Sequence, residues 1–484
     1  MHTTGIRNDY RRKQWRLAGI RRWPVAAGLV WAVVTAAVVH AGVANAAGTA
    51  SSTVNTAGTC LTSSPSWPNG VPIPTQTGKF AVSYDAVPQD NNMDGVTGFS
   101  SVLATGYTDL AVITRFNNSG FIDARNGGLY QAVTSIPYSA GLTYRFRLEV
   151  DIPNHKYNVY VTPPGSSERT IGVGFAFRTE QANASSLGYE NVFAAAGSQT
   201  VCNVKVSSIY DSVVLKDKPV MYLTMASPAS GSELDQTGRG NKGTYVGGTP
   251  AASSMPNGDK VAVFNGSGQY LTVPSDAALS IPTTKQLTWE AWIRPDVLDF
   301  PFTTGSVDKF VAWMGKCQKD VPKTCEWGAR MYNKSTDRPN RLSAYVFNLT
   351  QGLGSGADWQ PSPNVVKAAQ WLHVVGEYQT LITPTRCSSA YPGSIDIWVN
   401  GVKWNFTTHG DTGCMSQYKI TPTASTSPLN VATMSLTRDG WFKGAIGKVA
   451  VYNHLLSQNQ ITAHYSAMTG RQPSGSCGDT CTLP

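Results

Sequence analysis

The sequence predicts an all-β protein made of two consecutive antiparallel β-sandwich domains. Residues 144–152 alternate apolar and charged side chains without a break, as a strand with one buried face requires. Residues 394–399 also alternate and run into Asn400-Gly401, a pair that strongly favours a tight hairpin. Charged residues make up only 14% of the 484 residues, so the helix-favouring Glu and Lys are scarce. Short strands joined by turns are therefore expected along most of the chain.

The first 46 residues have the order of a secretory signal peptide. A basic stretch precedes an apolar run over residues 25–39, and Ala44-Asn45-Ala46 fits a cleavage site. The run of 15 residues is shorter than the roughly 20 that a membrane-spanning helix needs, and an uncleaved anchor is the alternative. We expect a secreted, extracellular protein that begins at Ala47 and has no membrane insertion after signal cleavage.

Removing this segment changes the charge of the protein. Residues 1–46 carry a net +6 of the formal +9, so the mature chain keeps only about +3. A field this weak does not indicate nucleic acid or an anionic membrane as a partner.

All eight cysteines follow residue 46, and in an exported protein they are expected to form disulfides before they hold a metal. The count alone allows many connectivities. Pairing neighbours within each expected domain gives Cys60–Cys202, Cys317–Cys325, Cys387–Cys414 and Cys477–Cys481.

The first sandwich is expected over residues 60–215, after a flexible linker of small residues at 47–59. Pro153-Asn154-His155 turns the strand at 144–152 back into a returning strand that begins at Tyr157. Further strands are expected at residues 79–84, 110–116, 120–126, 171–177 and 201–209.

The second sandwich is expected over residues 220–468, followed by a tail at 469–484. Besides the hairpin at Asn400-Gly401, residues 287–293 alternate as a strand. One short helix is expected at residues 457–465, with Ser457 as its N-cap.

Six blocks of the second sandwich resemble the laminin-G-like, concanavalin A-like lectin/glucanase family, in family order. These blocks lie at residues 235–243, 263–271, 289–295, 371–375, 398–401 and 444–457. The resemblance implies a jelly-roll fold for this domain. Residues 92–98 and 122–128 make the first domain similar to a β-sandwich module of exported bacterial carbohydrate-active proteins.

Calcium is a candidate cofactor in two places. The resemblance implies a rim site with Asp235 and Asn241, although the chain has Gly447-Lys448 where the family usually carries an acidic residue. Independently, Asp90, Asn92 and Asp94 follow the first half of a calcium-loop pattern, in which Ser101 replaces the final Glu. A turn whose Asn and Asp side chains bond their own backbone is the alternative there.

The sequence carries no clear catalytic pattern. Glycosidases of this fold use closely spaced carboxylates, and no such run is present. Glu149 and Asp151 share one strand face and are expected to be solvated, paired with Arg145 and Arg147.

One stretch combines cations, aromatic residues and a glycine-rich loop expected at residues 352–356. Bidentate guanidinium groups recognise carboxylates and aromatic faces stack on sugar rings, which suits an acidic or neutral glycan. The alternative is a solvated loop beside core aromatics. The candidate ligand-binding residues are Arg330, Tyr332, Arg338, Arg341, Tyr345 and Trp359.

These patterns favour a non-catalytic, lectin-like protein that binds polysaccharide or cell-surface glycan. The alternative is an enzyme on the same fold, either a glycosidase or, more plausibly, a polysaccharide lyase. A lyase would use Arg330 to neutralise a uronate, and Tyr345 or His373 to abstract the proton. A third alternative is an adhesin with a protein ligand.

Overall fold

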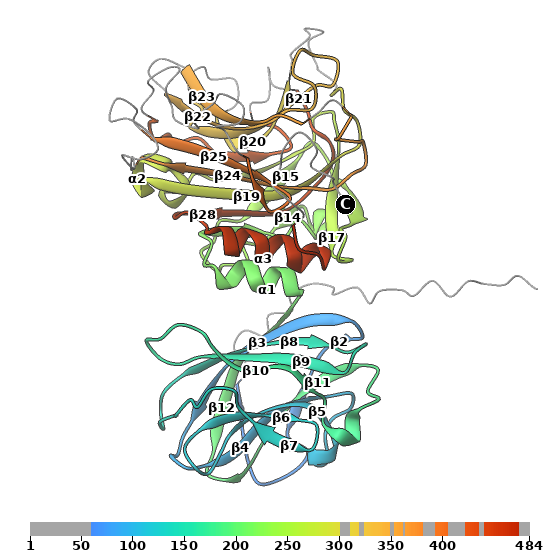
Figure 1. The fold of residues 1–484 in the computed structure, drawn as a ribbon, viewed down its shortest axis with the longest axis vertical. Helices are drawn as coiled ribbons and strands as arrows, with labels where there is room; N and C mark the ends of the chain where they lie inside the picture. Colours follow the sequence, from blue (N-terminus) through green and yellow to red (C-terminus); the bar gives the residue numbers. More distant parts are fainter. Residues whose placement is uncertain are drawn as a thin grey trace, which may run out of the picture. The chain divides into compact units, whose positions relative to one another are not determined.

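The computed structural model of this protein describes residues 60–300, 310–318, 324–348, 353–361, 364–380, 393–404, 422–434 and 440–473. Within these residues the chain forms two antiparallel β-sandwiches, as predicted (Figure 1). The expected signal peptide, the linker at 47–59, Cys387, Cys414, Cys477 and Cys481 lie outside the described residues. No helix in the described ranges is long and apolar enough to cross a membrane.

The first sandwich has two six-stranded sheets, ordered β1-β12-β3-β8-β9-β10 and β2-β11-β4-β5-β6-β7. Its strands are β1 (Leu61–Thr62), β2 (Gly70–Gln76), β3 (Lys79–Pro88), β4 (Asp94–Ser100), β5 (Leu110–Phe116), β6 (Ile122–Asn126), β7 (Leu129–Gln131), β8 (Tyr144–Asp151), β9 (Lys156–Thr162), β10 (Arg169–Ala176), β11 (Leu187–Ala196) and β12 (Gln199–Ser207). The disulfide Cys60–Cys202 is present, as predicted.

The alternating apolar side chains of β8 point into the core, as predicted. Phe146, Leu148 and Val150 are buried in the core between the two sheets. Leu148 pairs with Val159 on β9, so the apolar faces of the two strands are in register.

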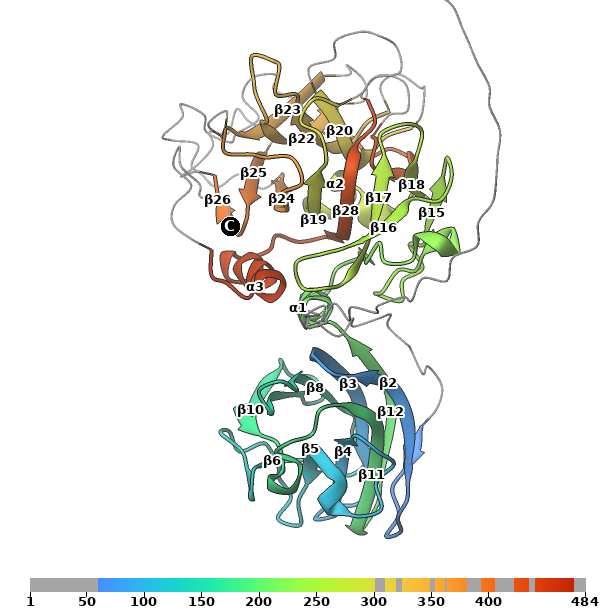
Figure 2. The ribbon, with the colours of Figure 1, turned by 90° about the vertical axis from the view of Figure 1, so that its right-hand side faces the viewer.

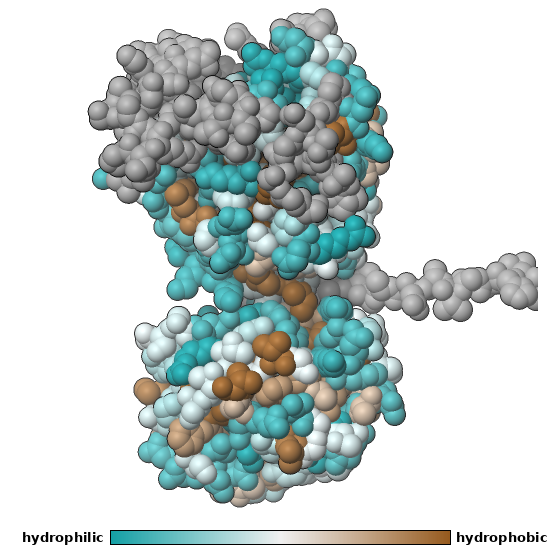
Figure 3. Space-filling view, in the orientation of Figure 1, coloured by the Kyte–Doolittle hydropathy of each residue, from teal (hydrophilic) through white to brown (hydrophobic). Residues whose placement is uncertain are grey.

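The surface of the first sandwich exposes several large apolar side chains, seen as brown atoms in Figure 3. Seven of the eight exposed large hydrophobic residues among the described ones belong to it, including Leu129, Val133 and Val173. Scattered exposed apolar residues are normal on soluble domains, so they do not by themselves indicate a partner.

The second sandwich has two eight-stranded sheets. One runs β16-β17-β28-β19-β24-β25-β26, with β13 paired to β28, and we call it the helix-covered sheet. The other runs β14-β15-β18-β27-β20-β21-β22-β23, and we call it the platform sheet. The strands are β13 (Met221–Leu223), β14 (Ser232–Glu233), β15 (Gly243–Val246), β16 (Ala251–Ser254), β17 (Lys260–Asn265), β18 (Tyr270–Val273), β19 (Gln286–Pro295), β20 (Phe310–Lys316), β21 (Trp327–Tyr332), β22 (Leu342–Asn348), β23 (Leu353–Trp359), β24 (Leu372–Gln379), β25 (Ser394–Val399), β26 (Val402–Lys403), β27 (Leu429–Val431) and β28 (Lys443–Tyr452).

In the part of the chain that the structure describes, the helices are few and short, as the composition predicts. They are α1 (Ile209–Lys216), α2 (Ile281–Thr284) and α3 (Gln458–Thr469), with single 3₁₀ turns at Tyr107–Asp109, Thr179–Gln181, Pro228–Ser230 and Ala277–Leu279. Ser457 caps α3 in a capping box, and Gly470 ends it with a positive φ of 69°. The α3 prediction is confirmed, with four more residues at its end. Helix α1 was not predicted, since its two adjacent valines weaken the helical signal.

Helices α1 and α3 lie side by side against the helix-covered sheet (Figures 1 and 2). They bury an apolar cluster on its outer face that contains Trp292 and Trp398. The larger core lies between the two sheets and contains Trp289, Trp313 and Trp327. The hairpin at Asn400-Gly401 is confirmed, with positive φ at both residues.

A candidate ligand-binding platform on the second sandwich

The candidate site lies on the outer face of the platform sheet, the face that points away from the core. Alternation positions its side chains, because Ala329 and Met331 on β21 and Ala344 and Val346 on β22 point into the core. The residues between them therefore point outward. They include Arg330 and Tyr332 on β21, and Tyr345 and Phe347 on β22.

Arg330 occupies the centre of a group of aromatic rings. Its guanidinium carbon lies 4.0 Å from the centroid of the Tyr345 ring, 4.3 Å from Phe310 and 5.3 Å from Phe347. These distances allow cation–π attraction. The Nε of Arg330 is buried and has no hydrogen-bond acceptor among the described residues. We call these four residues the Arg330 platform.

One of the two glycines that pair with Tyr345 makes room for its ring. Its strand partners are Gly328 on β21 and Gly356 on β23. A Cβ at Gly356 would lie 2.5 Å from Cε2 of Tyr345, so a larger residue there would displace the ring. Burial raises the pKa of the Tyr345 phenol, which therefore stays neutral near physiological pH. Of the stretch expected as a loop at residues 352–356, residues 353–356 instead begin strand β23, so the expectation was wrong for them, and residue 352 lies outside the described residues.

Arg338 and Tyr332 border the platform. The Nη1 of Arg338 donates to the Tyr332 hydroxyl at 3.2 Å, and Tyr332 packs edge-on against Phe310 at 5.4 Å between ring centroids. Tyr332 is only 4% exposed, so little more than its edge is available to a ligand. Arg338 therefore reaches the platform through Tyr332.

Arg341 lies beside the platform and already has partners. Its Nη1 donates to Asp358 Oδ2 at 3.0 Å, and its Nη2 donates to Gln360 Oε1 at 3.2 Å. The sequence indicated Arg341, and the structure brings Asp358 and Gln360 to it. In this arrangement Arg341 fixes the end of β23.

The structure contradicts the expectation that Trp359 offers a free face to a sugar. Trp359 is 1% exposed and belongs to the core between the sheets. It pairs with Leu342, which also points inward, so the register of β22 and β23 turns the indole away from solvent. On the outer face, Phe347 is buried beside the partly buried rings of Phe310 and Tyr345. Strict alternation along β22 would have indicated Phe347 beside Tyr345.

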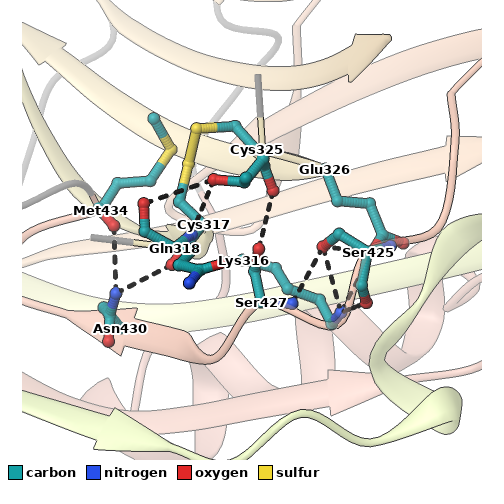
Figure 4. The surroundings of a disulfide bond; sticks show 10 residues. Lys316, Cys317, Gln318, Cys325, Glu326, Ser425, Ser427, Asn430 and Met434 are labelled. Carbon is teal, nitrogen blue, oxygen red and sulfur yellow. Dashed lines mark hydrogen bonds and ion pairs between the residues drawn. A yellow bond between two sulfur atoms is a disulfide. The ribbon is translucent and has the colours of Figure 1, made fainter. Parts of the chain in front are cut away.

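The predicted disulfide Cys317–Cys325 closes the connection between β20 and β21, the two strands that carry Phe310 and Arg330 (Figure 4). Beside it, the fully buried Lys316 and Glu326 form an ion pair at 3.2 Å. Glu326 also accepts from Ser280 Oγ at 3.1 Å and from the Ile281 amide at 2.7 Å. These contacts hold one end of the hairpin rigidly, as a preorganised site needs.

His373 does not join Arg330 and Tyr345. It lies on the outer face of the other sheet, is fully buried, and stacks on Trp292 at 4.9 Å. Its Nε2 lies 3.2 Å from Glu290, which also contacts His464 Nδ1 at 2.9 Å. Burial lowers the pKa of His373. The three residues expected for a lyase are therefore not assembled into one site.

The carboxylate of Glu290 and the imidazole of His464 form a buried ion pair beneath α3. Burial alone would lower the pKa of His464, but the Glu290 and Asp217 carboxylates outweigh burial and raise it to about 9. Burial alone would raise the pKa of Glu290, but the charge of His464 and hydrogen bonds with both histidines lower it. His464 Nε2 lies 3.0 Å from Asp217 Oδ2, so this group anchors α3.

The rim loop expected to bind calcium is organised by hydrogen bonds. Asp235 accepts from the amides of Tyr222, Thr237 and Asn241 and from the Thr237 hydroxyl, at 2.8–3.1 Å. Asn241 donates to the Val220 carbonyl at 2.9 Å. These bonds occupy both carboxylate oxygens of Asp235.

The second calcium candidate lies between β3 and β4. Asp90 Oδ2 accepts from the Ser198 amide at 2.9 Å, Asp94 lies 3.7 Å from Arg115, and Asn92 has a φ of 58°. No group of three or more His, Cys, Asp or Glu residues suited to a metal occurs in the part of the chain that the structure describes. Calcium binding at either place stays a prediction.

The charged face of β8 differs in part from the expectation. Arg147 pairs with Glu149, as predicted, and also with Glu168 at 2.7 Å. Arg145 pairs with Asp85, while Asp151 pairs with Lys79. The two acidic residues of β8 thus have basic partners and do not converge as a carboxylate pair.

Comparison with known proteins gives one family match and one curated relative. Residues 265–462 match a family model described as the concanavalin A-like lectin/glucanases superfamily. A gellan lyase from Bacillus sp is 24% identical over 92 residues, which cover 19% of this chain and only 4% of that enzyme.

Two solved structures show weaker likenesses. Domain 4 of an extracellular arabinanase from Geobacillus stearothermophilus, solved with arabinotriose, is 19% identical with a TM-score of 0.34, over 51% of this chain and 98% of that one. The receptor-binding domain of a botulinum neurotoxin C/D mosaic is 11% identical with a TM-score of 0.36, over 52% and 51% of the two chains. Neither TM-score supports a detailed comparison. The family match and the two packed sheets lead to one conclusion: the chain carries a domain of the concanavalin A-like lectin/glucanase superfamily at residues 265–462.

Proposed function

We propose that this protein is an exported glycan-binding protein, and that the Arg330 platform contacts an acidic polysaccharide. The observation that carries the proposal is a guanidinium enclosed by three aromatic rings on an outward sheet face, with a buried Nε that lacks an acceptor among the described residues. An unsatisfied buried donor is costly, and the side chain of Arg330 is partly exposed, so a ligand carboxylate can approach the guanidinium.

Local charge favours an acidic ligand over a neutral one. The segment at residues 330–341 contains three arginines and one lysine, with Asp337 as its single acidic residue. Arg341 and Arg338 already donate to Asp358 and Tyr332. Arg330 is therefore the cation best placed to receive a uronate carboxylate, while the partly exposed ring of Tyr345 faces the sugar.

The comparisons support a role in glycan recognition. The matched family is described by lectins and glucanases, and the short curated match is to an enzyme named as a gellan lyase. An acidic polysaccharide as ligand agrees with the charge of the platform.

A lyase on this platform is the rival function. A lyase base must release a proton near the working pH. The raised pKa of Tyr345 disfavours that role, and His373 lies on the opposite sheet. Binding without turnover is therefore the better-supported function, and an adhesin with a protein ligand has no feature of the platform in its favour.

A glycan array with the secreted protein tests the proposal, with ultraviolet absorbance recorded on the same substrates to detect unsaturated uronates. We expect binding to acidic polysaccharides without a rise in absorbance. A rise in absorbance would make the protein a lyase. Absence of binding to every acidic glycan would contradict the proposal.

A further inference from the structure

A second group of charged side chains lies buried between α1 and the helix-covered sheet. The Nζ of Lys448 on β28 lies 2.6 Å from Asp211 Oδ1 on α1 and 2.6 Å from Asp259 Oδ2. The three side chains are 2%, 9% and 5% exposed, in the same order. One ammonium group is thus held between two carboxylates, with little of any of the three side chains exposed.

The backbone of Lys448 is unusual for a strand. Its φ is 56°, in the left-handed region that non-glycine residues seldom adopt. The pairing of β28 with β19 shifts register here, so Lys448 lies in a bulge. A strained bulge that aims a buried lysine at two carboxylates suggests a function for the lysine.

The surroundings restrict the motion of all three side chains. The Tyr222 hydroxyl donates to Asp211 Oδ1, and Asn257 Nδ2 donates to Asp259 Oδ2 at 2.9 Å. The Lys448 Nζ lies 5.7 Å from the centroid of the Tyr210 ring. Tyr210 and Tyr222 are fully buried in the apolar cluster beneath the helices. An amine and a carboxyl group held in contact in an apolar setting have a high effective concentration.

We propose that Lys448 and Asp211 form an intramolecular isopeptide bond, with Asp259 carrying protons. The Lys448 ammonium first transfers one proton to the Asp211 carboxylate. The amine then attacks Cγ of Asp211, where the Tyr222 hydroxyl polarises the carboxyl oxygen. Asp259 takes a proton from the nitrogen and delivers it to the departing hydroxyl, which leaves as water.

The step is balanced without an oxidant or a cofactor. One C–N bond forms, one C–O bond breaks, one water is released, and Asp259 returns to its starting state. The product is an amide between residues separated by 237 positions in the sequence. It would fix α1 covalently to the sandwich.

Mass spectrometry of the complete secreted protein tests this bond after reduction, alkylation and tryptic digestion. We expect peptide 206–216 joined to peptide 444–471, lighter than their sum by one water, because an acylated Lys448 is no longer cleaved. Free peptides 206–216 and 444–448 would show a permanent ion triad and overturn the proposal. A bond from Lys448 to Asp259 would overturn the assigned roles.

Two variants and one internal control sharpen the experiment. Lys448→Arg keeps the charge but removes the amine, and Asp259→Asn keeps the shape but removes the proton carrier. Both should yield unlinked peptides. Lys316 is also fully buried against a carboxylate, that of Glu326, which is its one acidic partner among the described residues. It should be cleaved normally, and a linked peptide that persists in Asp259→Asn would contradict the role of Asp259.

Discussion

At the scale of single residues, the register between β22 and β23 determines which aromatic side chain points into the core and which points to the outer face. Trp359 and Tyr345 lie on neighbouring strands of one sheet, yet Trp359 is 1% exposed and Tyr345 is only partly buried. The sequence indicated both, because both stand near arginines and glycines. The pairing of Leu342 with Trp359 shows that Trp359 points into the core, whereas Tyr345 points outward. Pairing between strands cannot be predicted from local composition.

Replacing Trp359 by Ala should therefore destabilise the second sandwich. Loss of a buried indole leaves a cavity, and the expected cost is about 3–5 kcal/mol of unfolding free energy. Chemical denaturation followed by tryptophan fluorescence measures it. A variant that keeps wild-type stability and loses glycan binding would place Trp359 back in the ligand site.

Glu190 on β11 is a second residue with a testable consequence. It is 2% exposed, its Oε1 has no hydrogen-bond partner among the described residues, and burial raises its pKa from 4.5 to about 8. Between pH 4.5 and about 8, Glu190 therefore keeps its proton in the native state but has lost it in the unfolded chain. Stability of the first sandwich should fall as pH rises from 4.5 towards 8, since one pKa unit corresponds to about 1.4 kcal/mol.

The matched variant is Glu190→Gln, which resembles the protonated form. We expect it to equal the wild type near pH 4.5 and to be more stable at pH 8. Hydrogen exchange of the β3 and β12 amides reports on this sandwich. Equal protection in both proteins at pH 8 would show that Glu190 is not buried as described.

At the scale of secondary-structure elements, the strands with clear alternation were predictable and the helix contacts were not. Strand β8, the hairpin at Asn400-Gly401 and the cap of α3 follow from period and turn chemistry. Helix α1 could not be predicted from the sequence because tertiary contact with α3, rather than its own helix propensity, stabilises it. Strand β23 was not predicted because its glycines resemble those of a loop. In the structure, Gly356 lies within the strand and makes room for the Tyr345 ring.

Helix α3 should loosen at alkaline pH. His464 joins Glu290 and Asp217 with a pKa raised from 6.5 to about 9, while His373, on the far side of Glu290, has a lowered pKa. The charge of His464 therefore stabilises the fold fully below pH 6.5, and this contribution is lost as pH rises through 9.

Hydrogen exchange of the α3 amides between pH 7 and 10, corrected for intrinsic rates, measures this effect. We expect protection to fall across the titration of His464. In His464→Gln the pH dependence should disappear and protection should be low throughout. Protection of the wild type that stays constant to pH 10 would show that the ion pair does not anchor α3.

At the scale of the whole molecule, the disulfides agree with the proposed export of the protein. Two of the four predicted pairs, Cys60–Cys202 and Cys317–Cys325, are present in the described residues, and disulfides are typical of proteins outside the cytosol. The fold class and the family of the second sandwich could be predicted from ordered sequence blocks. The ligand site could be predicted only as a region, because its geometry depends on which face of each strand points outward.

The proposed export can be tested by identifying the first residue of the secreted protein. We expect the mature chain to begin at Ala47, since Ala44-Asn45-Ala46 fits a cleavage site. N-terminal sequencing of protein recovered from the culture medium measures this directly. A secreted form that retains residues 1–46 would contradict it.

The most direct test of the glycan-binding account is a calorimetric titration of an acidic polysaccharide into the wild type, Arg330→Gln and Arg294→Gln. Arg294 serves as the control: like Arg330 it lies near an aromatic ring, 5.6 Å from that of Trp371, but it pairs with Asp296 and belongs to β19 on the other sheet. Loss of Arg330 should weaken binding by about ten- to a hundredfold, as for an anchor of a desolvated contact, while Arg294→Gln should bind like the wild type. A folded Arg330→Gln protein that binds the polysaccharide as tightly as the wild type would contradict the account.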